Sequence, residues 1–336
     1  MRFIQNKLPL LAMAIAAAGI LPAQVPPNLE KEIRRIGPGL CFQETAVYYR
    51  PLEATPPYPG VTVTRDISFG PDPKNVLDLI EPEKGGGSRP VLIYVSGGAG
   101  NKHAGVANGD NYYDNIMLWA VKNGMVGVNM QRRPGTAWDD PAKDIALIVQ
   151  WVGQNIAQHK GNPGRVFMWV QSAGNVPTAT YIGHSEFWGP KGVGVTGVVF
   201  MSPPAFDILP ATPPTGMAGF TPCPQGNPGT AGPGPRADGK GRGKGGDQPD
   251  AATLLARSNL PGLLSAKVAY MIIAAELDPP NIIGFSKFLK DELCKGGHCP
   301  AFLDLKVHSH VSEVMAPNTP DNSVTGPILK WMKSVK

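Results

Sequence analysis

The stretch RVFMWVQSAGNVPTATYIGH, residues 165–184, decides the fold prediction. Residues 166–170 form a continuous apolar run, which is typical of a buried strand. Three small residues beginning at Ser172 then interrupt the run, and a segment of helical length follows. The pattern predicts that the chain leaves a buried strand, turns sharply at Ser172 and enters a helix.

The same alternation of strand and helix continues on both sides of this stretch. Further apolar runs predict strands, and segments with helical spacing or length lie between them. The expected strands are 90–98, 124–130, 194–203, 267–278 and 302–310, preceded by an antiparallel pair over 61–70 and 75–83, and the expected helices are 112–124, 143–159, 173–184 and 281–294. Continuous apolar strands separated by helices indicate an α/β protein whose mostly parallel sheet has helices on both faces.

An insertion over residues 203–262 interrupts this alternation. Gly and Pro are so frequent in it that its middle cannot be a regular helix or strand. We expect residues 225–250 to be flexible and functionally silent. The flanks, 203–220 and 251–264, carry apolar side chains and could form a cap over a site at the strand ends.

The composition indicates a globular protein with a small-molecule partner. Of the 336 residues, 42% are hydrophobic, enough for one large α/β domain, which we place over residues 24–336. The formal net charge is only +5 and the basic residues are scattered. The sequence therefore gives no indication of a nucleic-acid-binding surface.

Residues 1–23 are expected to form a signal peptide. Arg2 and Lys7 precede the apolar run LPLLAMAIAAAGIL, and the sequence LPA then offers small residues for cleavage before Gln24. The alternative is an uncleaved helix that anchors the chain, but the run is short for a bilayer span of about 20 residues. Cleavage implies a periplasmic or secreted protein. No later stretch of the sequence is long enough to span a membrane.

The four cysteines fit an exported protein with one or two disulfides. Cys294 and Cys299 flank the short glycine-rich loop KGGH, and we expect a disulfide between them. A metal site that recruits His298 is the alternative, but it lacks a fourth ligand. Cys41 and Cys223 either pair with each other or are both free.

Four segments of the sequence together resemble a known superfamily. They are VLIYVSGGAG (91–100), VQSAGN (170–175), AAELDPP (274–280) and HSHVSE (308–313). They look like the signature regions of the α/β-hydrolases, in the branch of carboxylesterases and hormone-sensitive-lipase-like esterases. Their order carries the resemblance, because nucleophile, acid and histidine each follow an expected strand, downstream of a glycine-rich turn. The resemblance covers roughly residues 60–336 and implies the α/β-hydrolase fold.

The resemblance implies a catalytic triad. It places the nucleophile on Ser172, the acid on Asp278 and the base on His310. A free serine is a weak nucleophile and needs such a base. Glu276, at the same strand end, is the alternative acid, and His308 is the alternative base. Either histidine could instead be a loop residue that is hydrogen-bonded to the backbone.

The resemblance also implies an oxyanion hole, a set of backbone N–H groups that stabilise negative charge on the substrate oxygen. The His-Gly-Gly-Gly motif of the superfamily falls on Ser96, Gly97, Gly98 and Ala99. The donors would be the N–H groups of Gly98, Ala99 and Ala173. Serine replaces the usual histidine and alanine the last glycine, which changes the side chains but keeps the backbone donors.

Val170 is a third departure, because it occupies the first glycine position of the Gly-x-Ser-x-Gly turn. Such a turn crowds the residues two before and two after the nucleophile. Gly174 keeps the second position. We expect Val170 to be tolerated, because its strand runs extended into the turn, where a β-branched residue is favourable.

The function implied by the resemblance is hydrolysis of a neutral carboxylic ester through an acyl-serine intermediate, with neither a cofactor nor a metal. An amidase or peptidase remains an alternative, because the same triad serves both reactions. The second hypothesis is a ligand-binding protein on a hydrolase scaffold, in which the triad is retained but the turns no longer catalyse.

Overall fold

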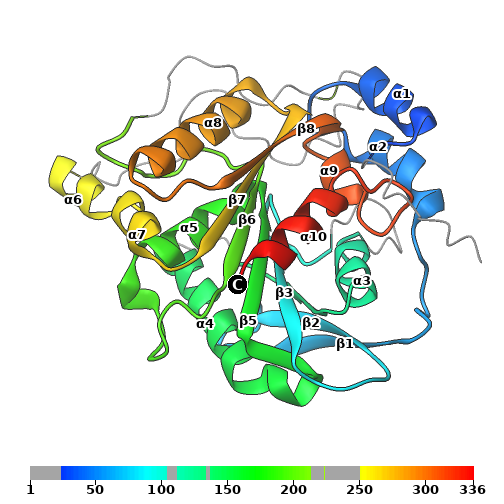
Figure 1. Cartoon of the computed structure of the whole chain (residues 1–336), viewed down its shortest axis with the longest axis horizontal. Helices are drawn as coiled ribbons and strands as arrows, with labels where there is room; N and C mark the ends of the chain where they lie inside the picture. The colour runs from blue at the N-terminus through cyan, green and yellow to red at the C-terminus, as the bar shows by residue number, and fades with distance from the viewer. Residues whose placement is uncertain (1–23, 104–111, 134–136, 213–222, 224–249) are drawn as a thin grey trace, which may run out of the picture.

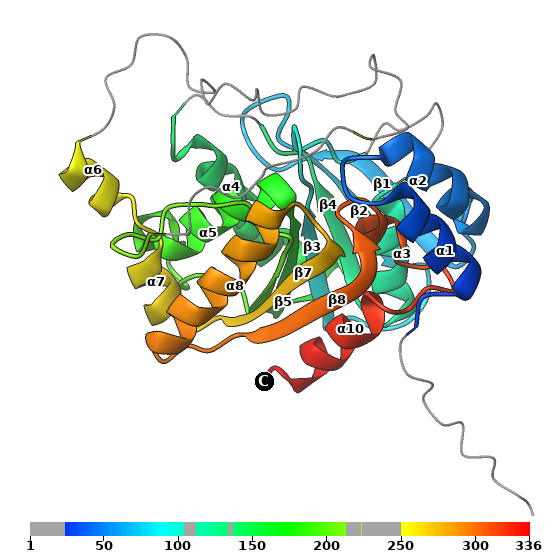
Figure 2. The same ribbon diagram turned by 90° about the horizontal axis from the view of Figure 1, so that it is seen from above.

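A computed structural model describes residues 24–103, 112–133, 137–212, 223 and 250–336. Within these residues eight strands form one sheet (Figures 1 and 2). They are β1 (Val61–Ser68), β2 (Val76–Pro82), β3 (Arg89–Val95), β4 (Val126–Met130), β5 (Gly161–Gln171), β6 (Gly197–Met201), β7 (Ala269–Leu277) and β8 (Ala301–Ser309). Their order is β1-β2-β4-β3-β5-β6-β7-β8. The predicted antiparallel pair is confirmed as β1 and β2, and all neighbours from β4 to β8 are parallel.

Helices cover both faces of this sheet, as predicted. The described helices are α1 (Pro27–Ile36), α2 (Phe42–Tyr49), α3 (Asp114–Lys122), α4 (Asp140–Asn155), α5 (Asn175–Gly183), α6 (Ala251–Ala256), α7 (Leu260–Ser265), α8 (Pro280–Lys295), α9 (Ser312–Met315) and α10 (Thr325–Ser334). Short 3-10 turns lie at Arg50–Leu52, Ile156–His159, Ser172–Gly174 and Ser185–Phe187. Figure 1 shows α4, α5, α7 and α8 on one side of the sheet and α1, α2, α3, α9 and α10 on the other.

Alternate residues of each central strand point to opposite faces, so the sheet separates two hydrophobic clusters. In β3, Val91, Ile93 and Val95 pack with the α4, α5, α7 and α8 side. Leu92 and Tyr94 pack with the opposite helices. Because both faces are buried, the strand reads as a continuous apolar run, which is the signal that identified it in the sequence.

The carboxyl ends of the parallel strands lie along one edge of the sheet, where α/β proteins place their sites. The residues that directly follow β3, β5, β6, β7 and β8 are Ser96, Ser172, Ser202, Asp278 and His310. Strands far apart in the sequence thus deliver polar side chains to one edge.

Phe206 and Leu263, on the two flanks of the insertion, pack into the core, whereas α6 has no buried residue. Phe206 lies against Phe200 of β6 and Phe285 of α8, with ring centroids 6.3 and 4.9 Å apart. Leu263 of α7 is fully buried in the same cluster. These side chains join the sheet to α8.

Several expectations concern residues outside the described part of the chain. Residues 213–222 and 224–249 lie outside the described part, so the cap and the flexible segment 225–250 stay predictions. The signal peptide over residues 1–23 also lies outside it. Among the helices that the structure describes, none has both the length and the apolar character needed to cross a membrane.

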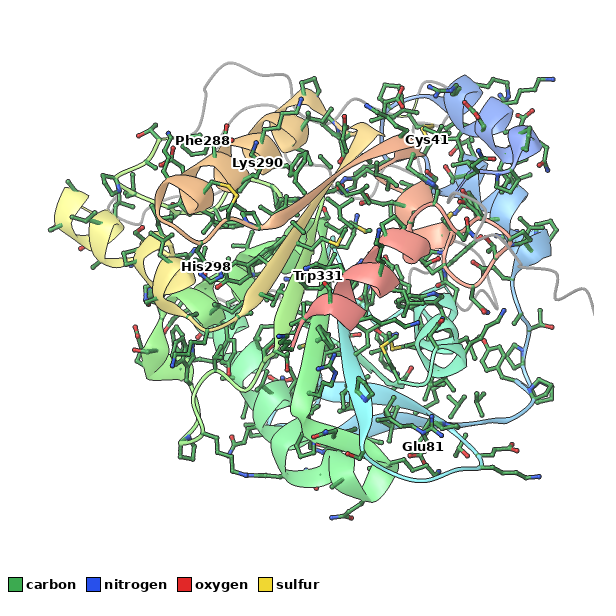
Figure 3. All side chains as sticks on the ribbon, viewed as in Figure 1. Cys41, Glu81, Phe288, Lys290, His298 and Trp331 are labelled. Carbon is green, nitrogen blue, oxygen red and sulfur yellow. A yellow bond between two sulfur atoms is a disulfide. The ribbon has the colours of Figure 1, made fainter. Side chains whose placement is uncertain are left out.

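Two disulfides tie loops together. Cys294 is bonded to Cys299 at the end of α8, as predicted, and Cys41 is bonded to Cys223. Figure 3 labels Cys41 and also His298, the residue considered for a metal site. The Nε2 atom of His298 lies 2.8 Å from the backbone carbonyl oxygen of Val268, so this ring nitrogen is hydrogen-bonded to the segment before β7.

Candidate active site

Ser172 lies at the predicted sharp turn, which the structure confirms. It directly follows β5, begins a 3-10 turn and is followed by α5 at Asn175. Its φ angle is +50°, in the left-handed region that residues other than glycine seldom adopt. Strained backbone of this kind is typical of functional turns, and here the serine is half-buried rather than enclosed.

The positions on either side of Ser172 have very different surroundings. A Cβ atom at Gly174 would lie 2.5 Å from the carbonyl oxygen of Val95 and 2.8 Å from that of Ser96, so only glycine fits. Val170, in contrast, lies inside β5 between Val95 of β3 and Phe200 of β6, and its side chain is fully buried. The first glycine of the usual motif is not required here, because this position is still strand.

Asn175 fastens the turn to the neighbouring strand. Its Nδ2 atom donates to the backbone carbonyl of Ser172 at 2.7 Å and to that of Met201, at the end of β6, at 2.9 Å. Asn175 is the last residue of the segment VQSAGN, and no pattern in the sequence indicates a role for it. Its bonds run to backbone atoms of a distant strand, which a local pattern does not show.

The glycine-rich loop after β3 lies directly beside Ser172. A Cβ atom at Gly97 would lie 2.7 Å from the Cβ atom of Ser172, so the two turns are in contact. Within the described residues, the N–H groups of Gly98, Ala99 and Ala173 make no hydrogen bond to another protein group. They are therefore available as the donors that the sequence analysis expected.

Ser96, which replaces the usual histidine, closes this loop. Its Oγ atom donates to the backbone carbonyl of Asn101 at 2.7 Å. The loop also contains Gly98 and Gly100, with φ angles of +53° and +83° that favour glycine. The hydroxyl bond thus holds the loop's two ends together in this chain.

Asp278 and His310 form a buried acid–base pair. The Nδ1 atom of His310 lies 2.7 Å from Asp278 Oδ1. Asp278 Oδ2 accepts hydrogen bonds from the backbone N–H of Ala275 at 2.8 Å and from Ser202 Oγ at 2.6 Å. A carboxylate fixed in this way orients the imidazole and stabilises its protonated form.

Gln171 connects this pair to the serine turn. It is buried next to Ser172, and its Nε2 atom donates to the backbone carbonyl of His310 at 3.1 Å. The structure therefore brings Ser172, His310 and Asp278 to the same edge of the sheet. The roles assigned to the three residues stay predictions.

The alternative acid, Glu276, is engaged elsewhere. Its Oε2 atom accepts the backbone N–H of Val307 at 2.7 Å, and its Oε1 atom accepts Arg34 Nη1 of α1 at 3.0 Å. Both bonds lower the pKa of Glu276 and hold it ionised at the edge of the sheet. It links β8 to α1.

The alternative base, His308, is fully buried among hydroxyl groups. Its Nδ1 atom lies 2.9 Å from Ser312 Oγ and its Nε2 atom 2.7 Å from Ser323 Oγ. Both ring nitrogens are therefore used to hold the loops after β8. The Nε2 atom of His308 also lies 3.5 Å from Asp321 Oδ2, so His308 has a carboxylate of its own, but of the two histidines only His310 contacts Asp278, the predicted acid.

Glu313 adds a second buried carboxyl group that the sequence analysis did not single out. Its Oε2 atom lies 2.9 Å from Ser202 Oγ, and its Oε1 atom accepts Gln171 Nε2 at 3.2 Å. Ser202 has one hydroxyl proton, yet its oxygen bridges the carboxyl groups of Glu313 and Asp278. If Ser202 donates to Asp278, Glu313 must be protonated and donate to Ser202.

Burial and the nearby charge of Asp278 raise the pKa of Glu313 well above its ordinary value, in agreement with a protonated carboxyl. In the sequence, the only indication of a role for Glu313 is its position three residues after His310, within the segment HSHVSE.

Besides Glu44 with the disulfide-bonded Cys41 and Cys223, two groups of side chains among the described residues have the composition of a metal site. Asp278, His310 and Glu313 bring ligand atoms within 4.8 Å of one another, but the N–H and O–H donors around Asp278 fit a carboxylate in a hydrogen-bond network. In the second group, centred on Asp78, the cationic side chains of Arg65 and Lys102 already occupy the carboxylate. Neither group has a donor set that favours a metal over the partners present.

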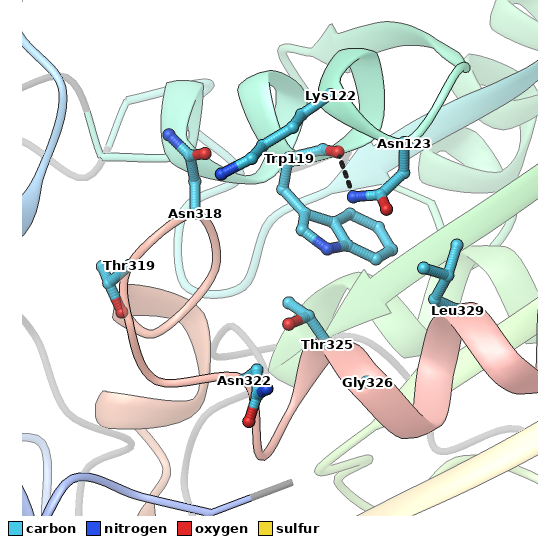
Figure 4. A pocket seen from close by; sticks show the side chains of 9 residues that line it. All are labelled: Trp119, Lys122, Asn123, Asn318, Thr319, Asn322, Thr325, Gly326 and Leu329. Carbon is cyan, nitrogen blue, oxygen red and sulfur yellow. Dashed lines mark hydrogen bonds between the residues drawn. The ribbon is translucent and has the colours of Figure 1, made fainter. Parts of the chain in front are cut away.

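A surface pocket of about 270 Å³ lies elsewhere, between α3, the loop before α10 and α10 itself (Figure 4). Its lining is Trp119, Lys122, Asn123, Asn318, Thr319, Asn322, Thr325, Gly326 and Leu329. None of these residues belongs to the predicted site, and we assign the pocket no role.

Part of the chain matches a family model. Residues 77–185 match the model described as BD-FAE. This segment extends from β2 to just beyond α5, so it contains Ser172 and the glycine-rich loop. It ends before Asp278 and His310.

Curated relatives align with a similar fraction of the chain. A probable isoprenylcysteine alpha-carbonyl methylesterase of Arabidopsis thaliana is 31% identical over 115 residues, which are 33% of this chain and 23% of that protein. The chain spans about a quarter of the length of the curated relatives that it matches first.

Solved structures with the same fold cover nearly the whole chain. Esterase B from Lactobacillus rhamnosis, inhibited by a tributyrin phosphonate, has a TM-score of 0.59 at 16% identity and covers 93% of this chain and 96% of its own. The hyperthermophilic esterase of the archaeon Pyrobaculum calidifontis has a TM-score of 0.59 at 14% identity and covers 94% and 98%. The chain therefore has the α/β-hydrolase fold of these esterases, and its segment around Ser172 is similar to the curated methylesterase.

Proposed function

We propose that this protein is a serine esterase that cleaves a carboxylic ester through an acyl-serine intermediate. The observation that carries the proposal is the pairing of two features at one sheet edge. Ser172 occupies a left-handed turn against the glycine-rich loop, and the hydrogen-bonded pair of Asp278 and His310 lies along the same sheet edge, at the ends of β7 and β8. This set of groups is the one that acyl transfer requires.

The residues act in two half-reactions. Ser172 Oγ attacks the acyl carbon while His310 Nε2 takes the hydroxyl proton, and Asp278 stabilises the imidazolium that forms. His310 then gives this proton to the departing alcohol oxygen as the ester bond breaks. In the second half-reaction His310 takes a proton from water, the hydroxide attacks the acyl-serine, and the proton returns to Ser172 as the acid leaves.

The oxyanion formed at the acyl carbon needs donors that are already in place. The N–H groups of Gly98, Ala99 and Ala173 fulfil this role in our proposal. Gly98 and Ala99 belong to the loop that contacts Ser172 through Gly97, and Ala173 directly follows Ser172. None of the three N–H groups makes another protein hydrogen bond within the described residues.

An ester is the proposed substrate because the similar proteins carry esterase names, including a methylesterase. We also propose that residues 1–23 direct export to the periplasm or the outside of the cell. The two disulfides support this location, because disulfides persist in oxidising compartments.

The test is a panel of chromogenic esters of increasing acyl length, with matched anilides, assayed on the purified protein and on Ser172→Ala. We expect ester turnover, lowered at least about a thousandfold by the substitution. A reactive phosphonate ester should add its mass to the wild-type protein at Ser172 and not to the variant. Turnover confined to the anilides would indicate an amidase. Wild-type rates equal to those of Ser172→Ala on every compound would indicate a ligand-binding protein instead.

A further inference from the structure

Arg132 is a buried arginine that contacts the glycine-rich loop. It follows β4, and only 6% of its surface is exposed. Its Nη2 atom donates to the backbone carbonyl of Gly98 at 2.7 Å, and its backbone N–H donates to the carbonyl of Gly100 at 2.8 Å. A Cβ atom at Gly100 would lie 2.6 Å from the Cβ atom of Arg132, so the arginine lies directly against the loop.

Among the described residues, Arg132 has no carboxylate of the kind that normally balances a buried guanidinium. Within the described residues no carboxylate lies within ion-pair distance of it, and its Nε atom has no hydrogen-bond acceptor. Burial lowers the pKa of Arg132, and Asp144 opposes this effect only from a distance. Burying a charge without a carboxylate partner raises the free energy of the folded protein. A buried arginine in such surroundings therefore indicates that its positive charge has a function.

The neighbouring arginine shows what an ordinary arrangement looks like. Arg133 forms hydrogen bonds to Asp144 at 2.6 Å and to Asp72 at 3.0 Å. Two adjacent arginines therefore differ sharply. Arg133 is neutralised by two carboxylates, whereas Arg132 is directed to a backbone carbonyl of the loop beside Ser172.

The contacted carbonyl belongs to the peptide unit that joins Gly98 to Ala99. The N–H of Ala99 is on the opposite side of the same unit, and it is one of the expected oxyanion donors. A charge-assisted bond to a peptide oxygen draws electron density from the nitrogen, which makes the N–H a stronger donor. The same bond fixes the orientation of the peptide plane.

We propose that Arg132 is a positioning residue of the oxyanion hole. It orients and polarises the Gly98–Ala99 peptide. Its positive charge is balanced when negative charge develops on the substrate oxygen. The inference rests on the proposed esterase function. It assigns to Arg132 an effect on the transition state and not on the binding of the neutral ester, because the charge develops only during the reaction.

The test compares Arg132→Gln and Arg132→Lys with the matched control Arg165→Gln. Arg165 also donates to backbone carbonyls, those of Met332 and Val335, without a carboxylate ion pair within the described residues. It lies near the beginning of β5, the end opposite Ser172. The control therefore removes the same kind of bond away from the site.

We expect Arg132→Gln to lower kcat by about ten- to a hundredfold with KM changed less than about twofold, a part of the loss seen when an oxyanion donor itself is removed. Arg132→Lys keeps the charge and should recover at least about a third of the wild-type kcat. The rate of phosphonate labelling at Ser172 should follow kcat, and Arg165→Gln should match the wild type in both.

Thermal melting of each variant separates a fold defect from this effect. A folded Arg132→Gln variant with wild-type kcat overturns the inference, as does an equal fall of kcat in Arg165→Gln. If Arg132→Gln does not fold, Arg132→Lys decides, because a tenfold increase in KM with unchanged kcat would contradict a transition-state role. Wild-type turnover at the level of Ser172→Ala overturns the proposed esterase function itself, and this inference with it.

Discussion

Glu313 Oε2 lies 2.9 Å from the hydroxyl oxygen of Ser202, and both side chains are completely buried. The same hydroxyl oxygen lies 2.6 Å from Asp278, so two carboxyl groups compete for one hydroxyl proton. A protonated Glu313 resolves the competition, because it then donates to Ser202 while Ser202 donates to Asp278. The second oxygen of Asp278, the acid of the proposed triad, is then fixed by the Ser202 hydrogen bond.

A protonated Glu313 makes stability depend on pH in a defined direction. The pKa of Glu313 is raised on folding, so above pH 4.5 the folded state binds more protons than the unfolded state. Stability then falls as the pH rises toward the folded pKa, by up to about 1.4 kcal/mol per pH unit for one group. The side chain at position 313 cannot ionise in Glu313→Gln. The free energy of unfolding of this variant, minus that of the wild type, should therefore increase as the pH rises. Urea denaturation at pH 5, 6, 7 and 8 measures the difference.

The control for Glu313→Gln is Asp304→Asn, which removes an exposed carboxylate paired with Lys306. Its stability curve should run parallel to that of the wild type. Parallel curves for Glu313→Gln as well would mean that Glu313 is ionised in the folded protein, contrary to the hydrogen-bond count. Turnover of Glu313→Gln should stay within about fivefold of the wild type, because its amide donates to Ser202 as the protonated carboxyl does.

Gly174→Ala should disable the proposed site. Its Cβ atom would meet the carbonyl oxygens of Val95 and Ser96 at 2.5 and 2.8 Å, and backbone atoms cannot move aside as a flexible side chain can. We expect turnover to fall at least about a hundredfold, because the serine turn and the oxyanion loop are pushed apart by an ångström or so. Steady-state kinetics on one chromogenic ester measures the loss.

Val170→Ala is the matched variant at the other flanking position. It removes two buried methyl groups and should lower the free energy of unfolding by about 1–3 kcal/mol. Turnover below the melting temperature should change by less than about fivefold, because Val170 is part of the strand and not of the turn. A loss as large as that of Gly174→Ala would show that Val170 shapes the turn after all.

The sequence predicts most of this fold because the central strands are buried on both faces. Their continuous apolar runs are unambiguous, and each predicted strand is present. Helices α1, α2, α6, α7, α9 and α10 were not predicted. In α1 only Leu29, Ile33 and Ile36 are buried, and the charged residues between them hide a short apolar stripe.

The site was predictable only in part. Ser172, Asp278 and His310 each follow a recognisable strand, and the resemblance of these segments to the α/β-hydrolase signatures is what singles the three residues out. Ser202 and Glu313 acquire their roles because β6 lies next to β7, a neighbourhood that depends on the strand order. Packing, and not sequence, likewise distinguishes the two adjacent arginines after β4.

The two disulfides predict that the folded protein has no reactive thiol. Labelling with a thiol reagent in denaturant, without a reductant, should modify none of Cys41, Cys223, Cys294 and Cys299. Reduction beforehand should expose all four, which mass spectrometry of peptides resolves. Quantitative labelling of Cys294 and Cys299 in the unreduced protein would contradict the bridge between them.

The last prediction separates the two histidines that follow β8. Both are buried, yet their neighbours differ, since His310 contacts Asp278 and His308 contacts the hydroxyls of Ser312 and Ser323. His310→Gln should therefore lower kcat at least about a thousandfold, as expected when the base of a triad is lost. His308→Gln should instead lower the free energy of unfolding by about 1–3 kcal/mol, because it disturbs two buried hydrogen bonds. Its kcat, measured well below the melting temperature, should stay within about threefold of the wild type. Melting curves and kinetics on the same preparations of both variants measure the two effects. A large loss of kcat in His308→Gln, with kcat of His310→Gln near that of the wild type, would assign the role of base to His308.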